Sequence, residues 1–171
     1  TMFIDSSTVD PSISQYVQKI VKEKGASFVD APVSGGVMGA QNATLTFMVG
    51  GTNDEFDRVK DFLTGMGKKV SHCGVCGMGE AAKICNNMML AISMCGVAET
   101  MNLAIRLGLD PKVFNEIINS STGRCWASEI NNPVPGLNQG TPPSDNYKGG
   151  FSAALITKDL GLASSVGKLD S

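Results

Sequence analysis

The sequence lacks a strong excess of charge of either sign. Its 14 basic and 16 acidic residues leave a net charge of −2, and the two signs are mixed along all 171 residues. Proteins that bind nucleic acid or an anionic membrane surface usually carry a basic patch or a run of like charges. We therefore expect neither a nucleic-acid partner nor a membrane partner.

Cysteine and histidine are too few for a disulfide scaffold or a zinc site. The five cysteines form an odd, scattered set, which favours a reducing intracellular compartment. Cys73 and Cys76 form one Cys-x-x-Cys pair beside His72, the single histidine of the chain. Tetrahedral zinc needs four ligands, so we interpret the pair as a turn at a strand end. No metal site is predicted.

Long hydrophobic runs are also missing. The longest nearly uncharged run, Ile84 to Ala98, is interrupted by asparagine and serine and is shorter than the roughly 20 residues that span a bilayer. We interpret it as part of a buried helix. No transit sequence is recognisable at Thr1, and the chain is expected to begin inside a domain.

Two patterns divide the chain near Gly77. Before this residue, segments of β-forming residues alternate with segments of helical spacing, which predicts parallel βαβ units. After it, helical patterns predominate. The strands are expected at 2–5, 26–33, 44–49 and 68–73, and the helices at 11–24, 56–63, 80–107, 111–122 and 151–166, with a long loop at 124–150. The predicted fold class is α/β followed by all-α: the C-terminal half of a Rossmann-type parallel sheet in 1–76, then an incomplete helical domain built on one long helix in 77–171.

Gly77, Gly79 and Ala82 imitate the Gly-x-Gly-x-x-Ala turn that binds dinucleotides. That fingerprint requires a second parallel strand soon afterwards, ending in an acidic residue that holds the ribose. Here the helix continues past Glu99 instead. We do not expect this turn to bind a pyrophosphate.

Lys83 is a candidate general base. It lies near the start of the long helix, where the macrodipole is positive, and the helix after it is almost wholly apolar. Both conditions lower the pKa of an amine, although spacing alone favours a surface lysine that extends from a core helix. Asn87 follows by four residues on the same face.

Ser34, Gly35 and Gly36 end a predicted strand, and their backbone N–H groups suit a carboxylate, although the segment taken alone favours a plain turn. Lys158 and Asp159 on the last helix resemble a solvated charged patch when taken alone.

Taken together, these segments resemble the β-hydroxyacid dehydrogenase family, and within it the animal 3-hydroxyisobutyrate dehydrogenases. The resemblance extends from about residue 1 to Ala163, in the same order and spacing. It rests on Asp30-Ala-Pro-Val-Ser-Gly-Gly36, Leu45-Thr-Phe-Met-Val-Gly-Gly51, Gly79-Glu-Ala-Ala-Lys83-Ile-Cys-Asn-Asn87, Ile84 to Met94, Gly123-Arg-Cys-Trp126, Asn132-Pro-Val-Pro-Gly136 and Lys158-Asp-Leu-Gly-Leu-Ala163.

The resemblance implies an NAD-dependent oxidoreductase that converts 3-hydroxyisobutyrate to methylmalonate semialdehyde in mitochondrial valine breakdown. Lys83 would be its general acid and base. Asn87 and the Ser34, Gly35 and Gly36 turn would bind the substrate, and Thr8 and Lys158 would contact the cofactor, NAD rather than NADP. A homo-oligomer is expected for the complete enzyme.

The resemblance also has limits along the chain. The first half of the dinucleotide-binding domain is not among these residues, Ala43 stands where the family commonly has glycine, and residues 164–171 depart from the family. We expect weak or no NAD binding by these 171 residues alone, and micromolar affinity in a calorimetric titration would contradict this. Two alternatives stay open: a related reductase of succinic or tartronate semialdehyde, and a non-catalytic truncated form that pairs with full-length subunits through its long helix.

Overall fold

The computed structural model of the chain describes residues 1–168, which divide into two compact units. The first unit contains Thr1–Asn86 together with the segment that begins at Thr157, and the second contains Asn87–Ile156. The long helix α4 (Met78–Arg106) starts in the first unit and continues in the second. The first turns of α4 therefore belong to the same compact unit as the sheet. The predicted domain boundary at Gly77 stays a prediction.

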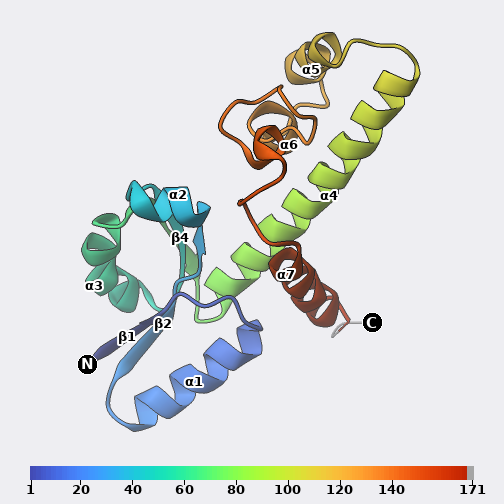
Figure 1. Ribbon diagram of the computed structural model, residues 1–171. Helices are drawn as coiled ribbons and strands as arrows, with labels where there is room; N and C mark the ends of the chain where they lie inside the picture. Colours follow the sequence, from blue (N-terminus) through green and yellow to red (C-terminus); the bar gives the residue numbers. More distant parts are fainter. Residues whose placement is uncertain (169–171) are drawn as a thin grey trace. The chain divides into compact units, whose positions relative to one another are not determined.

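The first unit is a five-stranded sheet covered by helices, so the Rossmann-type fold class is confirmed. The strand order is β1-β2-β4-β3, with β5 paired to β4. Figure 1 shows α1 and α3 on opposite sides of β1 and β2. The elements are β1 (Met2–Asp5), α1 (Pro11–Glu23), β2 (Ser27–Asp30), β3 (Val33–Ser34), α2 (Gly36–Gln41), β4 (Leu45–Gly50), α3 (Asn53–Thr64) and β5 (Gly67–Gly74), together with the part of α7 (Ala153–Val166) from Thr157 onward.

The sheet is mixed rather than wholly parallel, which corrects one expectation. β1 pairs with β2, and β4 with β5, in the predicted parallel direction. β4 runs antiparallel to β2 and β3. The strand expected over 26–33 is divided into β2 and β3 because Pro32 has no N–H to donate to a continuous ladder. The expected loop after Ser34 contains the short helix α2.

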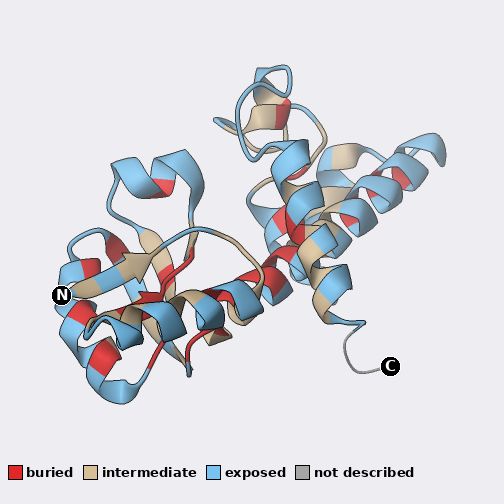
Figure 2. Ribbon diagram, turned by 90° about the horizontal axis from the view of Figure 1, so that it is seen from below, coloured by how far each residue is buried: buried red, intermediate tan, exposed pale blue. Residues whose placement is uncertain are grey.

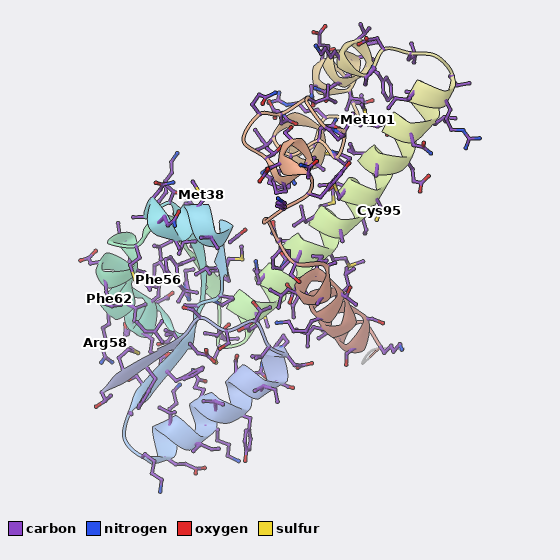
Figure 3. All side chains as sticks on the ribbon, in the orientation of Figure 1. Met38, Phe56, Arg58, Phe62, Cys95 and Met101 are labelled. Atoms are coloured by element: carbon purple, nitrogen blue, oxygen red, sulfur yellow. The ribbon has the colours of Figure 1, made fainter. Side chains whose placement is uncertain are left out.

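Helix starts follow the sequence closely. The Asp10 side chain accepts a hydrogen bond from Ser12 N at the start of α1, with Pro11 in the first turn. Thr52 and Glu55 form a reciprocal capping box at the start of α3. The core of the unit lies between the sheet and α3, and Figure 2 shows buried residues along the strands. Its members are Val29, Ala31, Phe47, Val49, Val59 and Leu63, and Phe56, labelled in Figure 3, packs against them.

The second unit packs short helices against α4. It contains α5 (Pro111–Ser120), α6 (Trp126–Glu129) and a 3₁₀ turn η1 (Pro142–Asp145). Met101 of α4, labelled in Figure 3, forms a buried cluster with Val97, Ile118 and Ala127. The loop expected over 124–150 thus carries two short helical turns, held by hydrogen bonds between asparagine and serine side chains.

Within residues 1–168, α4 is long and apolar enough to cross a membrane by length and composition. The sequence argument considered only Ile84 to Ala98 and so underestimated the apolar length. Such a helix is weak evidence for a membrane span, because core helices of soluble proteins have the same character. Figure 2 shows exposed residues along most of this helix.

Candidate active site

Lys83 is buried in the second turn of α4, and only 8% of the residue is exposed. Burial lowers the pKa of its amine, because the charged form loses hydration. The carboxylates of Asp159 and Glu80 oppose this shift, while the nearby charge of Lys158 adds to it. The net direction is downward, so the structure gives Lys83 the environment that a general base needs.

Asp30 fixes the start of the helix that carries Lys83. Its buried carboxylate accepts hydrogen bonds from Gly77 N at 2.7 Å and from Glu80 N at 3.0 Å. At Gly79 any Cβ would collide with the Met48 carbonyl oxygen, so glycine is required there. The Asp30 carboxylate takes the N–H groups that a phosphate would otherwise accept from. The glycine-rich turn therefore anchors the start of α4 on the sheet through Asp30, and the absence of pyrophosphate binding there stays a prediction.

Lys158 and Thr8 come together although 150 positions separate them. Lys158 Nζ donates a hydrogen bond of 2.8 Å to the Thr8 carbonyl oxygen. On the other side of the same peptide group, Val9 N donates to Glu80 Oε2 at 3.2 Å. This loop follows β1, at the carboxyl end of a parallel strand, where ligands bind in open α/β sheets. The two residues predicted to contact the cofactor thus lie at one place, near Lys83.

Glu80 and Asp159 are two site residues that the sequence analysis missed. Asp159 was taken as part of a solvated patch, but only 3% of it is exposed, and its Oδ1 lies 3.2 Å from Lys158 Nζ. Glu80 is fully buried, and burial raises its pKa to about 8. The spacing of Glu80, one turn before Lys83, was the one sequence signal for its presence.

The Ser34–Gly36 turn lies in the same unit as Lys83 but forms no direct bond with it. Ser34 pairs with Thr46 across β3 and β4. Gly35 and Gly36 have φ of 137° and 61°, and both are exposed. Among residues 1–168, no hydrogen bond or ion pair joins this turn to Lys83. A ligand role for the turn stays a prediction.

Asn87 is buried and lies one helical turn after Lys83 on α4. The two side chains share a helix face by their spacing. A substrate role for Asn87 also stays a prediction.

The surroundings of Cys73 and Cys76 favour the protonated thiol. Burial, with the charge of Asp30, raises the pKa of Cys76 to about 12, and burial raises that of Cys73. Metal binding and thiol exchange both need the thiolate. In the part of the chain that the structure describes, no group of three potential metal ligands is found.

Polar groups suited to a nicotinamide cofactor lie near Lys83 in the part of the chain that the structure describes. Lys158 and Thr8 are joined by a hydrogen bond near Lys83, whereas Asp30 already accepts from the N–H groups at the glycine-rich start of α4. A cofactor role for the loop after β1 and for Lys158 on α7 stays a prediction.

Two sequence families match the chain in succession. Residues 1–76 match the NAD binding domain of 6-phosphogluconate dehydrogenase. Residues 77–169 match the family described as NAD-binding of NADP-dependent 3-hydroxyisobutyrate dehydrogenase.

Several similar proteins are named 3-hydroxyisobutyrate dehydrogenase. The chain is 68% identical over 166 residues to the mitochondrial 3-hydroxyisobutyrate dehydrogenase of Drosophila melanogaster, covering 97% of this chain and 51% of that protein. It is 58% identical over 163 residues to the Homo sapiens protein of that name, covering 95% and 48%. A Mycobacterium tuberculosis 3-hydroxyisobutyrate dehydrogenase with L-serine superimposes with a TM-score of 0.93 at 46% identity, covering 97% and 57%. The chain thus spans about half the length of its curated relatives.

Proposed function

Because the chain belongs to the 3-hydroxyisobutyrate dehydrogenase family, we propose that the protein containing it is an NAD-dependent enzyme that oxidises 3-hydroxyisobutyrate to methylmalonate semialdehyde. The observation that carries the proposal is the buried amine of Lys83, which lies near the hydrogen-bonded pair of Lys158 and Thr8.

Lys83 is the proposed general base. In its neutral form the amine accepts the proton of the substrate's primary alcohol while the carbon–hydrogen bond breaks. The bound nicotinamide supplies the acceptor for the hydride. In the reverse reaction the ammonium returns the proton to the aldehyde oxygen. Burial favours this role because it destabilises the charged amine and so lowers the pKa of Lys83, which makes the neutral form easier to reach.

Substrate binding is assigned to the Ser34–Gly36 turn and to Asn87. The hydroxyl of Ser34 and the backbone N–H groups of the two glycines suit the substrate carboxylate. Asn87 would hold the substrate next to Lys83, since the two lie one helical turn apart.

Thr8 and Lys158 are the proposed cofactor contacts. The positive side chain of Lys158 and the Thr8 loop face the region around Lys83, where the reactive end of NAD is needed. A mitochondrial location and a role in valine breakdown are proposed because several relatives are named mitochondrial. We also propose a homo-oligomeric complete enzyme.

The test is a substrate comparison with the protein translated from the whole open reading frame, here called the complete gene product. Initial rates would be measured with NAD and NADP on 3-hydroxyisobutyrate, and in the reverse direction with NADH and NADPH on succinic and tartronate semialdehydes. We expect the largest kcat/KM for 3-hydroxyisobutyrate with NAD. A larger kcat/KM for succinic or tartronate semialdehyde would assign the protein as the related reductase. No turnover of any of these substrates would support the non-catalytic truncated form.

A further inference from the structure

One peptide group in the loop after β1 is held from both sides. Its carbonyl, from Thr8, accepts a hydrogen bond from Lys158 Nζ on α7 at 2.8 Å. Its N–H, from Val9, donates to Glu80 Oε2 on α4 at 3.2 Å. All four residues belong to the sheet-containing unit. Two helices far apart in sequence therefore set the orientation of a single peptide in the proposed cofactor loop.

The contact between Glu80 and Val9 requires an energetically unfavourable burial of the Glu80 carboxyl group. The residue is fully buried, and its second carboxyl oxygen, Oε1, has no hydrogen-bond partner. Its backbone N–H is separately bonded to Asp30 Oδ2 at 3.0 Å, so the first turn of α4 cannot rotate freely. Burying a carboxyl group with an unmade bond is unfavourable. A fully buried acid whose one hydrogen bond reaches a functional loop indicates a role beyond packing.

We propose that Glu80 is a positioning residue for the reaction, which fixes the Thr8–Val9 peptide for the cofactor and places a carboxyl group one helical turn from Lys83. This inference rests on the proposed function, because it gives the loop after β1 its role in holding the nicotinamide side of the dinucleotide.

The charge of Glu80 depends on its surroundings. Burial raises the pKa of its carboxyl group to about 8; the Val9 N–H opposes this, Asp30 and Asp5 add to it, and Lys158 opposes it. The ionised form, which dominates above that pH, accepts more strongly from Val9 N–H. It also raises the pKa of Lys83. Glu80 therefore links loop position to the state of the base.

The test compares Glu80→Gln and Glu80→Ala in the complete gene product, with Glu99→Ala, an exposed acid on the same helix, as the control. Glutamine keeps an oxygen that accepts from Val9 N–H, whereas alanine removes it. For Glu80→Ala we expect the dissociation constant for NAD, measured by calorimetry, to rise about tenfold. This corresponds to a loss of about 1.4 kcal/mol of binding free energy. Backbone amide exchange of the peptide containing Val9 should be faster, and kcat should change much less than KM for NAD. Glu80→Gln should restore NAD affinity and amide protection.

A second readout separates positioning from a merely structural role. Because Glu80→Gln removes a negative charge near Lys83, the acid limb of the kcat/KM profile should move to lower pH. Unchanged NAD affinity and unchanged Val9 exchange in Glu80→Ala would overturn the proposal. Equal losses in both variants, with no movement of the pH profile, would overturn it as well. If the unsubstituted protein oxidises no hydroxyacid, the proposed function fails, while NAD affinity and amide exchange still decide the role of Glu80.

Discussion

Lys158 Nζ donates a 2.8 Å hydrogen bond to the carbonyl oxygen of Thr8, joining the last helix of the described chain to the loop after its first strand. Lys158 also lies 3.2 Å from Asp159 Oδ1, which is itself buried. The side chain therefore has a fixed position at the edge of the site. Its charge reaches Lys83, whose pKa it lowers.

Replacing Lys158 by methionine should affect binding and proton transfer separately. Loss of the bond to Thr8 should raise KM for NAD by about tenfold, as expected for a hydrogen bond from a charged group. Loss of the positive charge should raise the pKa of Lys83, so the acid limb of kcat/KM moves to higher pH. Steady-state kinetics between pH 6 and 10, about the range where amines titrate, measure both effects.

The control is Lys60→Met, an exposed lysine on α3. It should leave KM and the pH profile unchanged. An unchanged KM in Lys158→Met would contradict a cofactor role for that residue.

Asp159→Asn should have the opposite effect on the pH profile. The Asp159 carboxylate raises the pKa of Lys83 against the effect of burial. Without it, Lys83 loses its proton more readily, and the acid limb should move to lower pH. Asp57→Asn, an exposed acid on α3, serves as the matched control. Movement to higher pH in Asp159→Asn would disprove the assignment of that limb to Lys83.

Asp30→Ala should destabilise the fold more than an ordinary helix-cap substitution. The variant leaves the N–H groups of Gly77 and Glu80 buried without their charged acceptor. We expect a loss of about 3 kcal/mol in the free energy of unfolding, measured with urea. Asp10→Ala, at the more accessible N-cap of α1, should cost about 1 kcal/mol. Equal losses would show that Asp30 is only a helix cap.

Ala43→Gly should stabilise the protein. Ala43 has φ of 52°, in the left-handed region, and follows α2 in a C-terminal cap where Thr44 N donates to Gly39 O at 2.8 Å. A side chain there costs about 1 kcal/mol, so glycine should add roughly 0.5–1 kcal/mol of stability. Ala40→Gly, inside α2, should lower stability by a similar amount. A lower free energy of unfolding for Ala43→Gly than for the unsubstituted protein would contradict backbone strain at Ala43.

The sequence predicted best what depends on local chemistry. Asp10 and Asp110, each followed by proline, cap the helices expected after them, because a cap needs only neighbouring residues. The unusual position of Ala43 was noticed by resemblance and has a backbone reason. Pro32, by contrast, divides a segment that hydrophobic pattern alone presents as one strand.

The charged network around Lys83 was less accessible from sequence. Glu80 and Asp159 are acids on helices, which usually face solvent, and nothing local shows that they are buried. Their burial arises from packing between α4, α7 and the loop after β1, contacts that join residues up to 150 positions apart. Lys83 itself was found by resemblance, since its spacing alone favoured a surface lysine.

The most direct test of the account is Lys83→Ala in the complete gene product, assayed for turnover and for NAD binding in parallel. The account predicts a fall in kcat of about a thousandfold, the scale of a lost general base. NAD affinity measured by calorimetry should stay within about twofold, and added small primary amines should restore part of the rate. Retention of most of the turnover would contradict the assignment of Lys83 as the base.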